Sequence, residues 1–90
     1  MSDDSSETLL EFPCEFPIKA IGHQSDDLVD IVYIIVQTHA PDIKKTAVTT
    51  RASKNEKYLA ITITVPATSK AQLDAIYIDL SASEHIVMTL

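Results

Sequence analysis

The sequence has one glycine, one cysteine and no tryptophan in 90 residues. A single glycine excludes the Gly-x-Gly loops with which nucleotide-binding domains bring their backbone close to a phosphate. A single cysteine excludes an internal disulfide and a paired-cysteine metal site. The longest apolar run, residues 31–36, is far shorter than the roughly 20 residues of a membrane-spanning helix. We therefore expect a cytoplasmic protein with no cofactor and no membrane partner.

Length and composition predict one folded domain preceded by a short tail. With 46% hydrophobic and 22% charged residues, the chain can bury a core without a disulfide or a structural metal. Residues 1–8 are polar and acidic, with no apolar periodicity and no positive region of the kind that opens a secretory signal. They predict a disordered acidic tail, and residues 9–90 predict a single domain.

Charge is distributed unevenly along the chain. The net charge is −6, yet five of the seven basic residues lie between positions 44 and 57, where Glu56 is the single acid. Such a cluster attracts an acidic partner within about 8–10 Å at cellular salt. It also arises when lysines keep an exposed strand edge soluble. Five bases are few for binding nucleic acid, so we expect no nucleic-acid partner. The candidate partner-binding residues are Lys44, Lys45, Arg51, Lys54 and Lys57.

Hydrophobic periodicity divides the domain into four strands and two helices. The first helix is expected to start with an N-cap at Ser25 and to run to about His39, because Pro41 stops it. The second follows a capping box of Ser69 and Gln72 and runs to about Ala82. Alternating apolar or β-branched residues predict strands over residues 16–22, 44–51, 58–65 and 86–90, with Pro66 ending the third.

The order of these elements is β-α-β-β-α-β. Right-handed crossovers place both helices on the same face of the sheet. The predicted class is α+β, a ferredoxin-like sandwich with a four-stranded antiparallel sheet and two helices on one face. The edges of such a sheet permit either a monomer or a homodimer. Because this fold carries many unrelated functions, its side chains have to decide the function.

The sequence lacks the residues that form most of the sites known on this fold. The outer face of the third strand carries Ala60, Thr62 and Thr64, whereas an RNA-binding sheet needs stacking aromatic residues. The only arginine, Arg51, lies far from the first loop, where a phosphate clamp would need it. No Ser/His/Asp set is evident from the order of the residues, and no acid/base pair or nucleophile stands out. We therefore expect no catalytic residues and no enzyme activity.

Some single residues could bind a metal or take part in a reaction, but each has a structural explanation. His23 stands near Asp26 and Asp27, but carboxylates at a helix start favour the helix dipole, and we expect no metal site there. Tyr33 and Tyr77 occupy helical positions, which predicts a packed ring with its hydroxyl group in water.

Several short segments resemble one known family. They are Leu9-Leu-Glu-Phe-Pro13 with the following residues to Lys19, the helix stop Thr38-His-Ala-Pro41, and the final Ile86-Val-Met-Thr-Leu90. Together they resemble the YbeD family of small bacterial proteins, described as lipoate regulatory proteins or as a domain of unknown function. The resemblance covers residues 9–90. It implies a ferredoxin-like fold similar to that of ACT regulatory domains, which sense amino acids.

The resemblance also implies a ligand site beside the loop between the first strand and the first helix. A glycine and the N–H groups at a helix start suit a close-lying ligand there, while the aspartates repel an anion and favour an amine. The first hypothesis is a small non-enzymatic regulatory or binding module that acts through this loop or through a protein partner at the open face or edges of the sheet, with lipoate metabolism as the context that the resemblance implies. Its candidate ligand-binding residues are Gly22, His23, Gln24, Ser25 and Asp26.

The alternative hypothesis is a protein-interaction adaptor. The basic hairpin, residues 44–57, would dock an acidic partner such as a carrier domain that bears a lipoyl or acyl group. Binding by this route should weaken with salt, whereas a small ligand in the first loop should raise the melting temperature.

Overall fold

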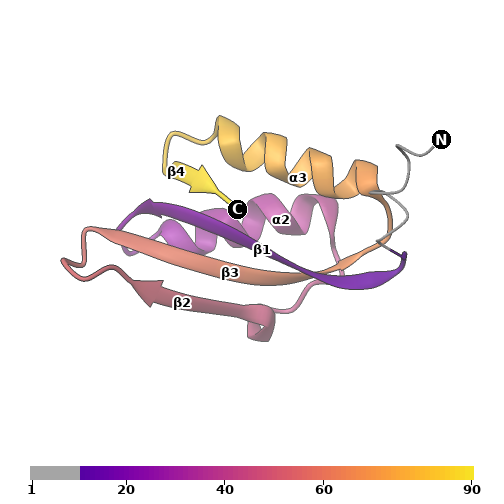
Figure 1. Ribbon diagram of the computed structural model, residues 1–90, viewed down its shortest axis with the longest axis horizontal. Helices are drawn as coiled ribbons and strands as arrows, with labels where there is room; N and C mark the ends of the chain where they lie inside the picture. The colour runs from indigo at the N-terminus through magenta and orange to yellow at the C-terminus, as the bar shows by residue number, and fades with distance from the viewer. Residues whose placement is uncertain (1–10) are drawn as a thin grey trace.

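The computed structural model describes residues 11–90. The predicted acidic tail, residues 1–8, lies outside these residues and stays a prediction. The described chain folds into four strands, two α-helices and a short 3-10 helix (Figure 1). In chain order they are β1 (Cys14–His23), α2 (Leu28–His39), η2 (Lys45–Ala47), β2 (Val48–Ala52), β3 (Tyr58–Ala67), α3 (Lys70–Ala82) and β4 (Ile86–Thr89).

The strands form one antiparallel sheet in the order β2-β3-β1-β4. The central strands β1 and β3 pair over their whole length, from Cys14 opposite Ala67 to His23 opposite Tyr58. In Figure 1 the sheet lies in front of α2, and α3 runs along its upper side. The predicted ferredoxin-like β-α-β-β-α-β fold is confirmed.

The core lies between the sheet and the two helices. Alternate residues of β3 are buried and those between them are half-buried or exposed, so the helices cover one face and leave the other open. Each fully buried Ile, Leu or Val side chain contributes about 1.5–3 kcal/mol. The largest completely buried side chains come from both central strands and both helices: Ile18, Leu28, Val32, Val36, Ile61, Ile63, Val65, Ile76 and Leu80.

β2 is shorter than the sequence predicts. A strand was expected over residues 44–51, but residues 45–47 form η2 and the strand begins at Val48. The reason lies in Ile43, which is buried and whose carbonyl accepts a hydrogen bond of 3.0 Å from the Tyr33 hydroxyl. η2 then leads the chain from Ile43, which is hydrogen-bonded to Tyr33 of α2, to the sheet.

β3 is longer than the sequence predicts, because Pro66 does not end it. The strand continues to Ala67, with Pro66 opposite Glu15. The last pair between β2 and β3 joins Val48 to Ile63, so among residues 11–90 no strand pairs with β3 on the β2 side at Pro66. A proline at such an unpaired edge removes no ladder hydrogen bond.

The start of α2 also differs from the prediction. Asp27 is the N-cap residue, and its side chain makes no capping hydrogen bond. Ser25 contributes only its backbone carbonyl, which accepts a hydrogen bond of 3.4 Å from the Leu28 N–H. The helix ends at His39, before Pro41, as predicted.

Ser69 is the N-cap residue of α3, as predicted. Its hydroxyl accepts a hydrogen bond of 3.1 Å from the Gln72 N–H. The Gln72 side chain does not complete a reciprocal capping box. Its Oε1 accepts from the Thr68 N–H at 2.7 Å, and its Nε2 donates to the His39 carbonyl at 2.8 Å. One side chain therefore caps the start of α3 and the end of α2, and His39 Nε2 adds a second link at 2.6 Å from Asp79 Oδ2.

Both helical tyrosines bind backbone carbonyls, contrary to the expectation that their hydroxyl groups lie in water. The Tyr33 hydroxyl donates to Ile43 and the Tyr77 hydroxyl donates to Leu90, each at 3.0 Å. Burial raises the pKa of Tyr77 above its ordinary value. Each bond ties a helix to a segment that leads into or out of the sheet.

Gly22 lies where β1, β4 and α2 meet. The β1–β4 register shifts at this point, so that Ile21 pairs with Met88 and Gly22 pairs with Ile86. A Cβ on Gly22 would overlap the His85 carbonyl oxygen and lie 2.9 Å from a Leu28 methyl carbon. The only glycine in the sequence is therefore required by close packing of the protein against itself.

We expect the Gly22→Ala substitution to lower the free energy of unfolding by about 2 kcal/mol or more, because backbone has to move to relieve the overlap. The melting temperature of a domain of this size should then fall by about 8–16 °C. Thermal unfolding followed by circular dichroism measures the change. An unchanged melting temperature would show that β4 approaches Gly22 less closely than described.

The two serines before the helices should respond differently to alanine. Ser69→Ala removes a capping hydrogen bond and should cost about 1 kcal/mol of stability. Ser25→Ala is the matched control, since the Ser25 side chain caps nothing, and should change stability by less than about 0.5 kcal/mol. Urea titration of both variants tests the assignment, which equal losses would contradict.

Candidate functional site

A hollow opens between α2 and β2, the strand at one edge of the sheet. Val29 and Tyr33 stand one turn apart on α2, and Val48 and Thr50 stand two residues apart on β2, so each pair points to one side of its element. Together with Asp30 and Lys45 they line a hollow of about 200 Å³, which is large enough for one apolar side chain. A broader depression of about 570 Å³ continues from it along α2 past Ile34 and Gln37.

Tyr33 fixes the shape of this hollow. Its hydroxyl holds the Ile43 carbonyl, which sets the path of the chain from α2 to β2. Its ring lies under Lys45, whose Nζ is 5.6 Å from the ring centroid, within the range of a cation–π contact. The floor of the hollow is apolar, and its rim carries the Lys45 ammonium and the Asp30 carboxylate.

The five basic residues predicted to bind a partner lie along the β2 edge and do not form a single patch. Lys44 and Lys45 precede the strand, Arg51 lies near its end, and Lys54 and Lys57 belong to the hairpin loop that follows. All five are exposed, and none forms an ion pair within residues 11–90. The edge therefore carries positive charge before the start of β2 and again from Arg51 into the hairpin loop.

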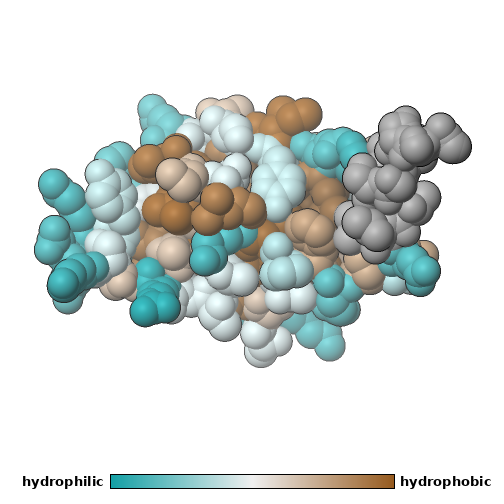
Figure 2. Space-filling view, in the orientation of Figure 1, coloured by the Kyte–Doolittle hydropathy of each residue, from teal (hydrophilic) through white to brown (hydrophobic). Residues whose placement is uncertain are grey.

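The hairpin loop holds its lysines in a defined position. The Ser53 Oγ accepts hydrogen bonds from the N–H groups of Lys57 and Tyr58, at 3.2 and 3.1 Å. The Ser53 carbonyl accepts another from the Glu56 N–H at 2.9 Å, and Glu56 adopts a left-handed conformation with φ of 56°. In Figure 2 hydrophilic residues gather at this end of the molecule, on the left.

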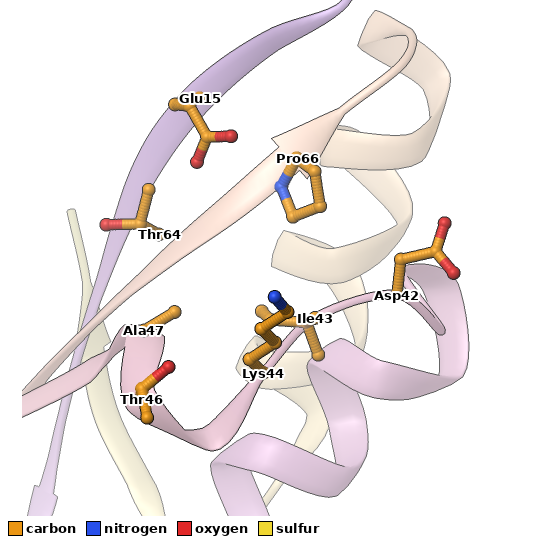
Figure 3. A pocket seen from close by; sticks show the side chains of 8 residues that line it. All are labelled: Glu15, Asp42, Ile43, Lys44, Thr46, Ala47, Thr64 and Pro66. Carbon is orange, nitrogen blue, oxygen red and sulfur yellow. The ribbon is translucent and has the colours of Figure 1, made fainter.

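A second hollow lies in front of the first residue of β2, where β3 continues past it (Figure 3). It measures about 310 Å³, and Figure 3 shows the Lys44 side chain rising toward Pro66 while Glu15 stands on the β1 side and Asp42 at the margin. Two carboxylates beside one ammonium leave an excess of negative charge, which does not suit an acidic ligand. This hollow is a weaker candidate than the one between α2 and β2.

The predicted ligand loop, from Gly22 to Asp26, stays a prediction. Gly22 is buried, and the space above it is filled by Leu28 and His85. The His23 ring lies 5.3 Å from the Tyr58 ring, and the Gln24 N–H donates to the Lys57 carbonyl at 2.9 Å, which extends the central ladder. Ser25 and Asp26 are exposed. None of these residues lines the hollows described above.

Apolar side chains also gather on the open face, over β4 and the adjoining part of β1 (Figure 2). Val87 and Met88 are each 51% exposed, and Leu90 is 62% exposed.

Among residues 11–90, no three His, Cys, Asp or Glu side chains come close enough together to hold a metal ion. In the same residues no helix has the length and apolar character needed to span a membrane.

Comparison with known proteins gives the chain its family. Residues 7–90 match the model of a family described as a protein of unknown function, DUF493. The chain belongs to this family. The YbeD family is the same group, so the resemblance drawn from the sequence is confirmed. A UPF0250 protein of Chromobacterium violaceum is 42% identical over the whole of both chains. The UPF0250 protein NE1487 of Nitrosomonas europaea is 41% identical and covers 96% of this chain and 99% of its own.

A solved structure supports the fold of the DUF493 chain. The solution structure of protein HP0495 from H. pylori matches with a TM-score of 0.77 and covers 100% of this chain and 94% of its own, at 20% sequence identity. At that identity the likeness concerns the fold alone. The family is described as one of unknown function, and the names of these relatives state no activity.

Sequence reasoning found the basic residues of the β2 edge and missed the hollow beside them. Val29 and Val48 lie far apart in the chain, and neither stands out by chemistry. Tyr33 offered a signal, because an aromatic residue with a polar end on the flank of a helix often marks the margin of a core.

Proposed function

We propose that this protein is a non-enzymatic binding module that docks an acidic protein segment along the β2 edge. The observation that carries the proposal is an exposed sheet edge with basic residues at both of its ends and an apolar hollow beside its middle. The charge attracts and orients the partner, and the hollow supplies the apolar contact from which a complex gains affinity.

Two features of the edge support docking over simple solubility. Lysines alone suffice to keep an edge strand soluble, and no hollow is needed for that. Here Tyr33, Val29 and Val48 leave an apolar space next to the charges. The bases are also uncompensated by ion pairs within residues 11–90, so an acidic partner does not have to displace an existing pair there.

Charge reversal tests the proposal. A library of short random peptides displayed on phage and selected on the protein should yield acidic sequences. Lys45→Glu and Arg51→Glu should each weaken binding of a resynthesised acidic peptide at least about tenfold at low salt, because each change replaces an attraction with a repulsion. Raising salt from about 50 to about 500 mM should reduce binding by the intact edge.

Lys19→Glu is the matched control. Lys19 is exposed on β1 in the centre of the sheet, so the substitution changes net charge equally and leaves the β2 edge intact. Fluorescence anisotropy of a labelled peptide measures all three variants. If all three variants lost the same affinity for the peptide, binding would depend on net charge and not on the β2 edge. Selection of peptides without acidic residues would refute the proposal.

A small-ligand function at the loop from Gly22 to Asp26 is the second candidate. It is supported by the exposure of the bend after His23 and by the ring contact of His23 with Tyr58, which leaves one side of the loop ordered and accessible. This version places the protein among ligand-sensing modules similar to ACT domains, with lipoate metabolism as a suggested context.

A thermal-shift panel of amino acids and lipoate-related compounds tests this second candidate. A ligand present at about 100 times its dissociation constant should stabilise the fold by about 2.7 kcal/mol, which is a readily measured rise in melting temperature. His23→Ala should abolish the rise. A panel without any shift counts against the small-ligand version and leaves docking at the β2 edge untouched.

A further inference from the structure

Within residues 11–90, the outer edge of β2 presents backbone groups that have no strand partner. The Ser53 N–H donates to the Tyr58 carbonyl at 2.8 Å, and in an antiparallel ladder the direction of these groups alternates from residue to residue. Thr49 and Arg51 therefore direct their N–H and C=O groups towards β3. Val48, Thr50 and Ala52 direct theirs away from the sheet. The Val48 N–H donates a hydrogen bond to the Lys45 carbonyl. Thr50 is therefore at the centre of the unpaired edge.

The side chains of β2 alternate between the two faces of the sheet. Thr50 lies opposite Ile61 and points to the helix side, where it lines the hollow with Val29 and Tyr33. Arg51 lies opposite Ala60 and points to the open side. A strand laid against β2 would have the same alternation, because side chains of paired strands share a face.

From this geometry we infer that the partner binds as an added strand: an extended segment pairs its backbone with Thr50, places one apolar side chain in the hollow between α2 and β2, and places acidic side chains next to it on the open side, beside Arg51. This inference rests on the proposed function and specifies the partner. The expected sequence pattern is an apolar residue at position i with aspartate or glutamate at i−1 or i+1.

A second copy of this chain does not suit the same edge. If two β2 strands paired antiparallel about Thr50, Lys44 and Lys45 of each copy would lie beside the hairpin loop of the other. That loop carries Lys54 and Lys57 against the single acid Glu56. In this register Lys44 lies opposite Glu56, but at each end both copies still carry an excess of positive charge, which disfavours their approach. The charge therefore selects an acidic partner over self-association.

Proline substitution separates strand addition from docking by charge alone. Thr50→Pro removes the outward N–H without touching the β2–β3 ladder, and proline is tolerated where its nitrogen faces away from a sheet. We expect it to weaken binding of the selected acidic peptides at least about tenfold, through the lost hydrogen bond and an unpaired carbonyl on the peptide. Thr50→Val keeps the N–H and the shape of the side chain, and should bind within about twofold of the unaltered protein.

Thr89→Pro is the matched control at the opposite edge of the sheet. Leu90 exchanges both backbone hydrogen bonds with Lys19, so Thr89, one residue earlier in β4, directs its N–H outward. This variant should bind as the unaltered protein does. Thermal melts establish that both proline variants fold. Should Thr50→Pro not fold, amide hydrogen exchange of the unaltered protein decides, since peptide binding should slow exchange at Thr50 and leave Thr89 unchanged.

Filling the hollow tests the apolar contact independently. Val29→Phe should weaken binding of a peptide that has the apolar residue, and replacing that residue by alanine should then cost nothing further, which a double-mutant cycle measures. Ile78→Phe, on the exposed side of α3, is the control. Additive effects of Val29→Phe and the peptide alanine would show that the apolar residue binds elsewhere.

The outcomes distinguish this inference from the proposed function. If selection yields no acidic peptides, docking at the β2 edge fails and strand addition fails with it. If acidic peptides bind and respond to Lys45→Glu, but Thr50→Pro and Thr89→Pro bind equally well, docking stands and strand addition is overturned. A loss confined to Thr50→Pro, together with coupling at Val29, supports the added strand.

Discussion

The pairing of β1 with β3 is the constraint on which the rest of the structure depends. The two strands match residue for residue over the full length of both. Because side chains alternate between faces, this register places Ile18, Ile61 and Ile63 together on the side of the helices. A slip of one residue would turn all three towards solvent, so the core and the register require each other. The helices cover only the face that this register makes apolar.

The outer strands are short, and the difference in strand length creates the surfaces available for binding. β2 pairs with β3 only as far as Val48, and the chain before it turns through η2 to reach Ile43 on the flank of α2. Hydrogen bonds from the Tyr33 hydroxyl to the Ile43 carbonyl and from the Ile43 N–H to the Ala40 carbonyl hold that path. The hollow is the space that remains between the helix and the edge strand. The site therefore depends on the core through one tyrosine that contributes to both.

The parts of the fold that follow from local pattern were predictable, and the parts set by distant contacts were not. The alternation in residues 58–65 and the Ser69 cap are local, and both appear as expected. Pro66 lies within a strand because β2 stops short of it, which no local pattern reveals. The same holds for the site. Clustered bases are visible in the sequence, whereas the apolar hollow requires Val29 and Val48 to meet across the packing of α2 on the sheet.

The charge on the β2 edge resolves a conflict that every open sheet edge presents. An unpaired edge binds other strands without discrimination, and lysines reduce that hazard by adding repulsion. The repulsion acts on basic strands and becomes an attraction for an acidic one, whereas a neutral strand gains no attraction from the ammonium groups. An apolar space beside Thr50 adds a requirement for one correctly placed side chain. In the proposed docking mode, these two conditions together make the edge selective for an acidic segment with one correctly placed apolar side chain, without any change to the sheet that presents it.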